Sequence, residues 1–326
     1  MLARSAAGLY WMGRYLRRVE HVSRLMEVQV DALVDQSLEQ IHFGWLRLFS
    51  HLKVTNPSAV LESDFRNHED WSFSDSFILA DDLTFNVDNP SSIVNCFLQG
   101  RENARQMRHC ISAEMWLSLN RTHFRLKDLT IDSIWQRDPH LFYAEIVQHI
   151  STFMGVCAAT LYRDERWEFL QIGRYIEHAQ LMAALLIYQA QSATMENYEE
   201  LDGYDWKSLL DCFQADQPYQ NRYGVKVEPN HVMNMLVTDS ILPNSIDHAV
   251  DQIRMRMGEL GQAPAQKSGA LAQRFTGRLV SLLRYEWPDV EDKRRLLTLV
   301  ESLAYKFHDH LSNAWFNYEI IDSSRI

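Results

Sequence analysis

The sequence predicts an all-α protein, folded as a compact helical bundle built from two similar helical halves. Its 326 residues include 12 Gly and 8 Pro, which is few for a turn-rich β fold and favours long helices. Apolar residues recur at spacings of three, four and seven, the pattern of an amphipathic helix. A short phrase is also written twice, because GRYL at residues 13–16 returns as GRYI at residues 173–176. Repetition inside two helical stretches indicates a duplicated structural unit.

The first copy begins with two predicted helices, over residues 5–36 and 38–52, each with an apolar stripe. From residue 53 to residue 76 polar residues interrupt the pattern, so a loop with short helices is expected. The letters NPSS at residues 89–92 predict a helix start, since proline suits the first turn and Asn or Ser caps it. Residues 91–130 then predict one or two long helices.

The second copy opens at Trp167, after an apolar segment over residues 140–162 that predicts a buried helix. Residues 202–230 are rich in Asp, Gln, Tyr and Pro and are expected to be irregular. The letters LPNSI at residues 242–246 repeat the earlier helix start. The remaining expected elements are a loop over residues 258–269 and two closing helices over residues 270–320.

The landmarks therefore follow one another in the same order twice. We expect a single domain over residues 1–326, with an internal repeat over about 5–150 and about 165–320. No linker rich in Pro, Gly or Ser divides the copies near residues 150–166, which argues against two separable domains.

Charge and cysteine content limit the classes of partner. The net charge is −11 and the pI is about 5.6, so there is no general attraction to nucleic acid or to an anionic membrane. The four cysteines form no CxxC pair and lie in apolar surroundings, which favours reduced, buried thiols. The opening residues do not read as a signal peptide, and the longest apolar runs are too short to span a bilayer. We expect a cytoplasmic protein.

Common cofactor and metal motifs are absent. The sequence has no Walker loop, GxGxxG, GxSxG or HExxH. Glu39-x-x-His42 is one Glu-x-x-His motif, but a carboxylate di-iron site needs two of them and two further glutamates. We therefore expect neither a metal nor a cofactor.

The two copies of the repeated phrase carry the charged residues that form a pattern. Arg14 and Arg18 are one turn apart, and Arg174 and Glu177 are spaced to pair on one helix. The favoured interpretation is an ion-pair network that ties the two repeat helices together. The alternative is a site for a phosphate or carboxylate, in which the three arginines donate hydrogen bonds and Glu177 orients one of them.

Helix starts are a second candidate for anion binding. Asn89, Ser91, Ser92 and Ser245 mark predicted helix N-termini, where free backbone N–H groups attract anions. Ordinary capping explains these residues as well and is the favoured interpretation. No catalytic residue is identified by the sequence.

Three segments together resemble the bacterial alpha-E family, which is named for a predicted α-helical domain with a Glu-Arg motif. They are LYWMGRYLRRVEHVSRL, then DNPSSI with RENARQMRHCISAEMWLSLN, then LYRDERWEFLQIGRYIEHAQ, and the resemblance extends to about residue 320. The chain departs from the family at the Glu-Arg pair itself. That pair reads Arg17-Arg18 in the first copy and Glu177-His178 in the second, so only Arg18 and Glu177 match.

Members of that family sit beside, or are fused to, circularly permuted ATP-grasp ligases and transglutaminase-like proteins. The resemblance therefore implies a helical component of an amide-bond-forming system, which presents a substrate to an ATP-grasp carboxylate–amine ligase or shapes its acceptor site. Two alternatives stay open: a stand-alone acyl- or amide-transfer enzyme with an Arg/Glu anion site, and an inactive structural scaffold. The substrate and the oligomeric state are not predicted by the sequence.

Overall fold

The computed structural model describes residues 1–55, 57, 73–192, 202–261 and 263–317. Within these ranges the chain contains fourteen α-helices, one π-helical segment and no strand, which confirms the all-α prediction. The helices are α1 (Ala3–Asp35), α2 (Leu38–Leu52), α3 (Phe73–Phe85), α4 (Ile93–Gln106), α5 (Ala113–Leu126), α6 (Ile131–Trp135), α7 (Pro139–Thr160), α8 (Glu165–Ser192), α9 (Asp202–Cys212), α10 (Asp216–Tyr223), α11 (Pro229–Thr238), α12 (Ile246–Glu259), α13 (Gln266–Ser281) and α14 (Lys293–Trp315), and the π-helical segment is η4 (Leu282–Glu286).

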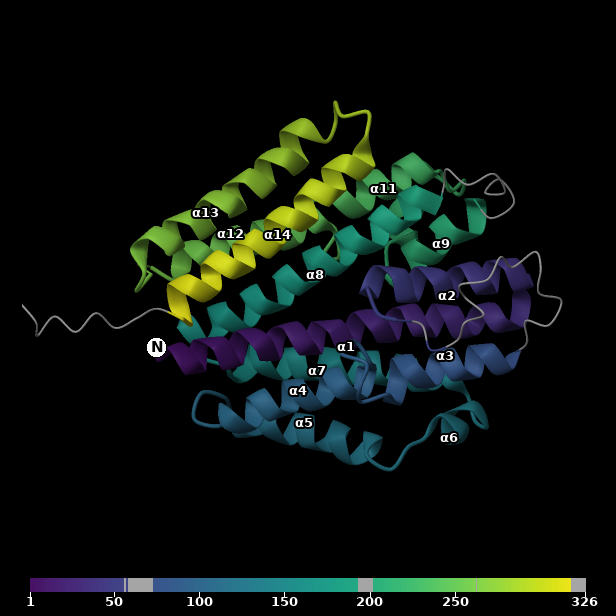
Figure 1. Cartoon of the computed structure of the whole chain (residues 1–326), viewed down its shortest axis with the longest axis horizontal. Coiled ribbons are helices and arrows are strands. Elements are labelled where there is room, and N and C mark those ends of the chain that lie inside the picture. The colour runs from purple at the N-terminus through teal and green to yellow at the C-terminus, as the bar shows by residue number, and fades with distance from the viewer. Residues whose placement is uncertain (56, 58–72, 193–201, 262, 318–326) are drawn as a thin grey trace, which may run out of the picture.

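The two long helices α1 and α8 run side by side through the middle of the molecule (Figure 1). Helix α1 also packs against α4 and α7, and α5 packs against α7. Helix α8 packs in turn against α12 and α14, and α13 packs against α14. One hydrophobic cluster of buried side chains continues through both groups. The internal repeat and the equivalence of the two halves in space stay predictions, and α2 of the first half packs against α8 of the second.

Two glycines, one from each copy of the phrase, allow the close approach of α1 and α8. A β-carbon on Gly13 would collide with the carbonyl oxygen of Leu170, and one on Gly173 would collide with that of Tyr10. Both obstacles are backbone atoms, which cannot rotate away as a side chain can. These positions therefore require glycine, and the contact is reciprocal because Tyr10 and Leu170 hold matching places in the two copies.

Capping side chains fix several of the helix starts. Ser37 and Gln40 form a capping box at the start of α2. Ser92 accepts a hydrogen bond from the backbone N–H of Asn95 at the start of α4, and Ser245 caps α12 in the same way. Helix α7 begins with Asp138 as its cap and Pro139 in its first turn. The starts predicted near residues 89–92 and 242–246 are thus confirmed.

The structure corrects two predictions of loops. Residues 202–230, expected to be irregular, contain α9, α10 and the first residues of α11. Trp206, Leu209 and Phe213 are buried there, so packing against the core holds helices whose polar composition concealed them. The loop expected over residues 258–269 is shorter, because α12 continues to Glu259 and α13 begins at Gln266. Most of the loop predicted over residues 53–76 lies outside the described residues.

Candidate functional site

A buried carboxylate on α8 holds the first helix in place. Glu177 is 1% exposed, and its two oxygens bind two arginines of α1. Arg14 Nε donates to Glu177 Oε2 at 2.5 Å, and Arg18 Nε donates to Glu177 Oε1 at 2.6 Å. Three of the four candidate residues therefore meet at the interface between α1 and α8.

The remaining donors of these arginines are directed at other protein groups. Arg14 donates to Gln180 Oε1 at 2.6 Å and lies 3.4 Å from the hydroxyl of Tyr10. Arg18 donates to the hydroxyl of Ser91 at 3.1 Å, which ties the start of α4 to α1. Arg14 and Arg18 are thus bound within the protein.

The charges at this centre fix its protonation. Burial alone would raise the pKa of Glu177, but the adjacent charges of Arg14 and Arg18 outweigh it and lower the pKa below its usual value. Burial raises the pKa of the neighbouring Tyr10 to about 12, although Arg14 opposes the shift. Glu177 is therefore ionised and Tyr10 protonated at neutral pH, and neither has the pKa of a general acid or base working near pH 7.

Arg174, the fourth candidate, has different neighbours. It lies near Arg17 and Glu20 of α1, and burial followed by the charge of Arg17 lowers its pKa. Within the described residues Arg174 makes no hydrogen bond or ion pair, and its ring contact is with Tyr175, whose centroid lies 5.7 Å from the guanidinium carbon. The structure thus brings Arg14, Arg18 and Glu177 together and leaves Arg174 apart from them.

The residues that depart from the family's Glu-Arg pair also bind each other. Arg17 Nη2 donates to His178 Nδ1 at 2.6 Å, and His178 Nε2 lies 2.9 Å from the carbonyl oxygen of Asn244, to which it donates. His178 is therefore neutral, and burial followed by the charge of Arg17 lowers its pKa well below the usual range. A second nitrogen of Arg17 donates to Glu20 at 2.7 Å.

This second pair was not among the candidates predicted from the sequence. The sequence did contain a signal for this pair. In the repeated phrase Arg17 is equivalent in position to Glu177, and Arg18 is equivalent to His178. Each arginine binds the residue that is equivalent to the other arginine: Arg18 binds Glu177, and Arg17 binds His178.

The candidate helix start near Asn89 is bound by protein groups. The side-chain oxygen of Asn89 accepts from the backbone N–H of Ser91 at 2.9 Å, and its amide donates to Asp82 at 2.6 Å. Ser91 binds Arg18 and Ser92 caps α4, so these side chains act in turn formation, in contact with α1 and in capping.

Other sequence features give no site in the described part of the chain. Glu39 is exposed while His42 is buried, and no group of three or more His, Cys, Asp or Glu among the described residues is placed to hold a metal ion. All four cysteines are free, buried thiols. None of the described helices is long and apolar enough to cross a lipid bilayer.

A family model for Alpha-E, a predicted alpha-helical domain with a conserved ER motif, matches residues 1–316. The chain belongs to the Alpha-E family. Among curated proteins, this Alpha-E chain is similar to an uncharacterized protein of Mycobacterium bovis and to uncharacterized proteins from two strains of Mycobacterium tuberculosis. Each is 22% identical over 307 residues, which cover 88% of this chain and 33% of the relative. No solved structure matches it.

The Alpha-E chain thus spans about a third of the length of the curated relatives that it matches. The two residues that match the Glu-Arg pair of the family resemblance, Arg18 and Glu177, are not neighbours along the chain. Glu177 comes from the second copy and Arg18 from the first, and they form an ion pair across the interface between α1 and α8. In this chain the motif residues therefore join the two central helices.

Proposed function

We propose that this Alpha-E chain is a helical binding component that works with an ATP-grasp carboxylate–amine ligase in forming or modifying an amide bond. The observation that carries the proposal is the closed centre at Glu177. Both carboxylate oxygens bind arginines that are themselves held by protein groups, so the centre stabilises a scaffold. Under this proposal the ligase binds ATP and activates the carboxylate, and the Alpha-E chain presents a substrate or completes the acceptor site.

The length of the relatives supports a role within a larger system. About two thirds of each matched mycobacterial protein lies outside the region similar to this chain. That extent is compatible with the fusions to ATP-grasp and transglutaminase-like proteins that the family resemblance implies. We place this system in the cytoplasm of a bacterium, where the free thiols of the chain would stay reduced.

A stand-alone acyl- or amide-transfer enzyme is less well supported. Such an enzyme needs a nucleophile or proton-transfer group that can reach a substrate. At the Arg/Glu centre the carboxylate is nearly inaccessible and stays ionised, and burial raises the pKa of the nearby Cys96 thiol to about 12. The groups at this centre therefore favour an inert structural role over chemistry.

The test is reconstitution with the ATP-grasp ligase of the same organism. We expect the two proteins to co-purify, and we expect the rate of ADP release in the presence of carboxylate and amine substrates to change when the Alpha-E chain is added. Unchanged ADP release together with no co-purification would exclude the proposal.

The same assay separates a structural centre from a reactive one. Arg18→Ala should lower the melting temperature, because Glu177 loses one of its two partners, while the folded variant still binds the ligase. Arg254→Gln, at an exposed position of α12, is the matched control and should change neither property. An Arg18→Ala variant with unchanged melting and no ligase response would instead assign a direct role to the centre.

A further inference from the structure

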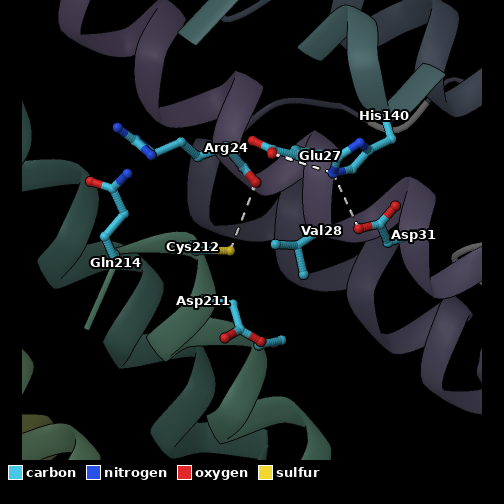
Figure 2. A pocket seen from close by; sticks show the side chains of 9 residues that line it. Arg24, Glu27, Val28, Asp31, His140, Asp211, Cys212 and Gln214 are labelled. Carbon is cyan, nitrogen blue, oxygen red and sulfur yellow. Dashed lines mark hydrogen bonds and ion pairs between the residues drawn. The ribbon is translucent and has the colours of Figure 1, made fainter. Parts of the chain in front are cut away.

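A pocket of about 330 Å³ lies between α1, α7 and α9 (Figure 2). At roughly 30 Å³ for each water molecule, this volume corresponds to about eleven water molecules. Val28 and Cys212 form part of the wall, and the polar lining includes Arg24, Glu27, Asp31, His140, Asp211 and Gln214. The pocket therefore accommodates a small molecule rather than a macromolecule.

At one end of the pocket, around Arg24 and Glu20, arginines outnumber carboxylates. The Arg24 side chain is 11% exposed and gives one hydrogen bond, from Nη2 to Glu20 Oε1 at 3.2 Å. Its buried Nε has no partner among the described residues. Glu20 also binds Arg17 and lies near Arg174, so three arginines share one carboxylate. The excess of arginines over carboxylates at this end favours an anion at Arg24.

The other end carries carboxylates with little compensation. Glu27 and Asp31 follow Arg24 on the same side of α1, and the ionic partner of both in the described structure is His140 Nε2, at 3.4 Å from each. Burial raises the pKa of both carboxyl groups. His140 opposes the shift at both, and Arg24 also opposes it at Glu27. Asp211 differs from them, because Lys207 binds it at 3.0 Å. This end therefore favours a cation beside Glu27 and Asp31.

The spacing along the helix sets the length of the ligand. At 1.5 Å per residue, Glu27 lies about 4.5 Å and Asp31 about 10.5 Å beyond Arg24 along the axis of α1. An α-amino acid carries both charges on one carbon and cannot place them at the two ends. A chain of several atoms between the charges can.

We propose that this pocket binds a linear aminocarboxylate, with its carboxylate on Arg24 and its ammonium group beside the carboxylates of Glu27 and Asp31. A dipeptide, or a chain that ends in an amino group like that of lysine, has the required chemistry. The lining residues named here all belong to this chain, so the inference does not depend on the ligase partnership.

The probe is 6-aminohexanoate, titrated into the full chain by calorimetry at neutral pH. Hexanoate and hexylamine carry one charge each, and glycine carries both charges at too short a separation. We expect 6-aminohexanoate to bind at least about tenfold more tightly than any of the three. Equal binding of hexanoate would show a simple anion site, and no binding of 6-aminohexanoate would show no site. Either result overturns the proposal.

Two variants locate the binding. Arg24→Gln removes the anion partner, and Asp31→Asn removes a carboxylate whose side chain is 61% exposed, so this second change should leave folding intact. Each is expected to weaken binding at least about tenfold, whereas Arg254→Gln, at an exposed position of α12, should have no effect. If Arg24→Gln lowers the melting temperature too far for titration, Asp31→Asn decides the matter. Undiminished binding to Asp31→Asn would overturn the assignment.

Discussion

Arg14 and Arg174 hold equivalent places in the repeated phrase, yet their surroundings have opposite charge. Arg14 binds the carboxylate of Glu177, which belongs to the second copy. Arg174 instead lies near Arg17 of the first copy. The helix interface therefore holds an ion pair at Arg14 and two like charges near Glu20 at Arg174.

This difference predicts unequal costs for the same substitution. Arg14→Met leaves the buried Glu177 with one partner and should lower the free energy of unfolding by about 3 kcal/mol. Arg174→Met removes a desolvated charge beside Arg17, and should change it by less than about 1 kcal/mol in either direction. Urea denaturation of both variants measures the difference. Equal losses would show that Arg174 has a stabilising partner.

Buried histidines predict the response of the molecule to acid. His21, His51 and His178 are buried, and burial lowers the pKa of each, to about 4 for His51. A histidine with a lowered pKa stays neutral in the folded state while the unfolded chain takes up a proton below pH about 6.5. The free energy of unfolding should therefore be greatest above pH about 6.5 and fall as the pH approaches 4.

The expected loss is about 3 kcal/mol for His51 alone over that interval, since each unit of pKa shift is worth about 1.4 kcal/mol. Urea denaturation at pH values between 7 and 4.5 measures the slope. His51→Gln should make the slope shallower, and His231→Gln, at a partly exposed position of α11, should leave it unchanged. A stability that stays flat across the interval would contradict the prediction.

At the scale of the elements, the crossing of α1 and α8 depends on the absence of two side chains. Gly13→Ala places a methyl group against the carbonyl oxygen of Leu170, so the helices must separate along their length. We expect a loss of at least about 2 kcal/mol in the free energy of unfolding, as is typical of overpacking in a rigid contact. Thermal or urea denaturation provides the measurement.

Gly155→Ala in α7 is the matched control. A β-carbon there meets no atom within 4 Å, so the change removes the flexibility of glycine without a collision. It should stabilise the protein by roughly 0.5–1 kcal/mol. The prediction for Gly13→Ala would be wrong if both variants gained stability.

The helices with long apolar stripes could be predicted from the sequence, and α1 and α2 begin and end within a few residues of the predicted bounds. The short helices α9 and α10 could not. Helix α9 depends on packing against α1, far away in the sequence, and α10 buries one residue of its own, Tyr219, and packs against α9 and α11. The amino-acid composition of a segment does not predict such tertiary contacts. The same reason explains the missed pocket, whose walls come from three helices far apart in the sequence.

The sequence could identify candidate residues only where they lie in the repeated phrase. The doubled phrase identified Arg14, Arg18 and Glu177, which the structure brings together. The sequence could not determine that Glu177 is shared by two arginines, because that depends on the rotation of α1 about its axis relative to α8. The place of Arg174 follows from the same rotation.

At the scale of the whole molecule, α1 and α8 form the centre of one continuous core. Trp45 of α2 and Trp287, which follows η4, are both buried in this single hydrophobic cluster. Neither central helix has its buried face covered without the other, so the chain should unfold as one unit although its sequence predicts a repeat. A single domain over the whole chain stays a prediction, and it can be tested directly.

Native-state hydrogen exchange provides that test. Peptides from α4, which packs on α1, and from α12, which packs on α8, should exchange with the same free energy of opening. Gly13→Ala should lower that energy in both helices by the same amount, because separating α1 from α8 exposes the core that they share. Gly155→Ala should lower it in neither. If α12 kept its full protection in Gly13→Ala while α4 lost it, the chain would consist of two units that fold independently, despite the buried ion pair between Arg14 and Glu177.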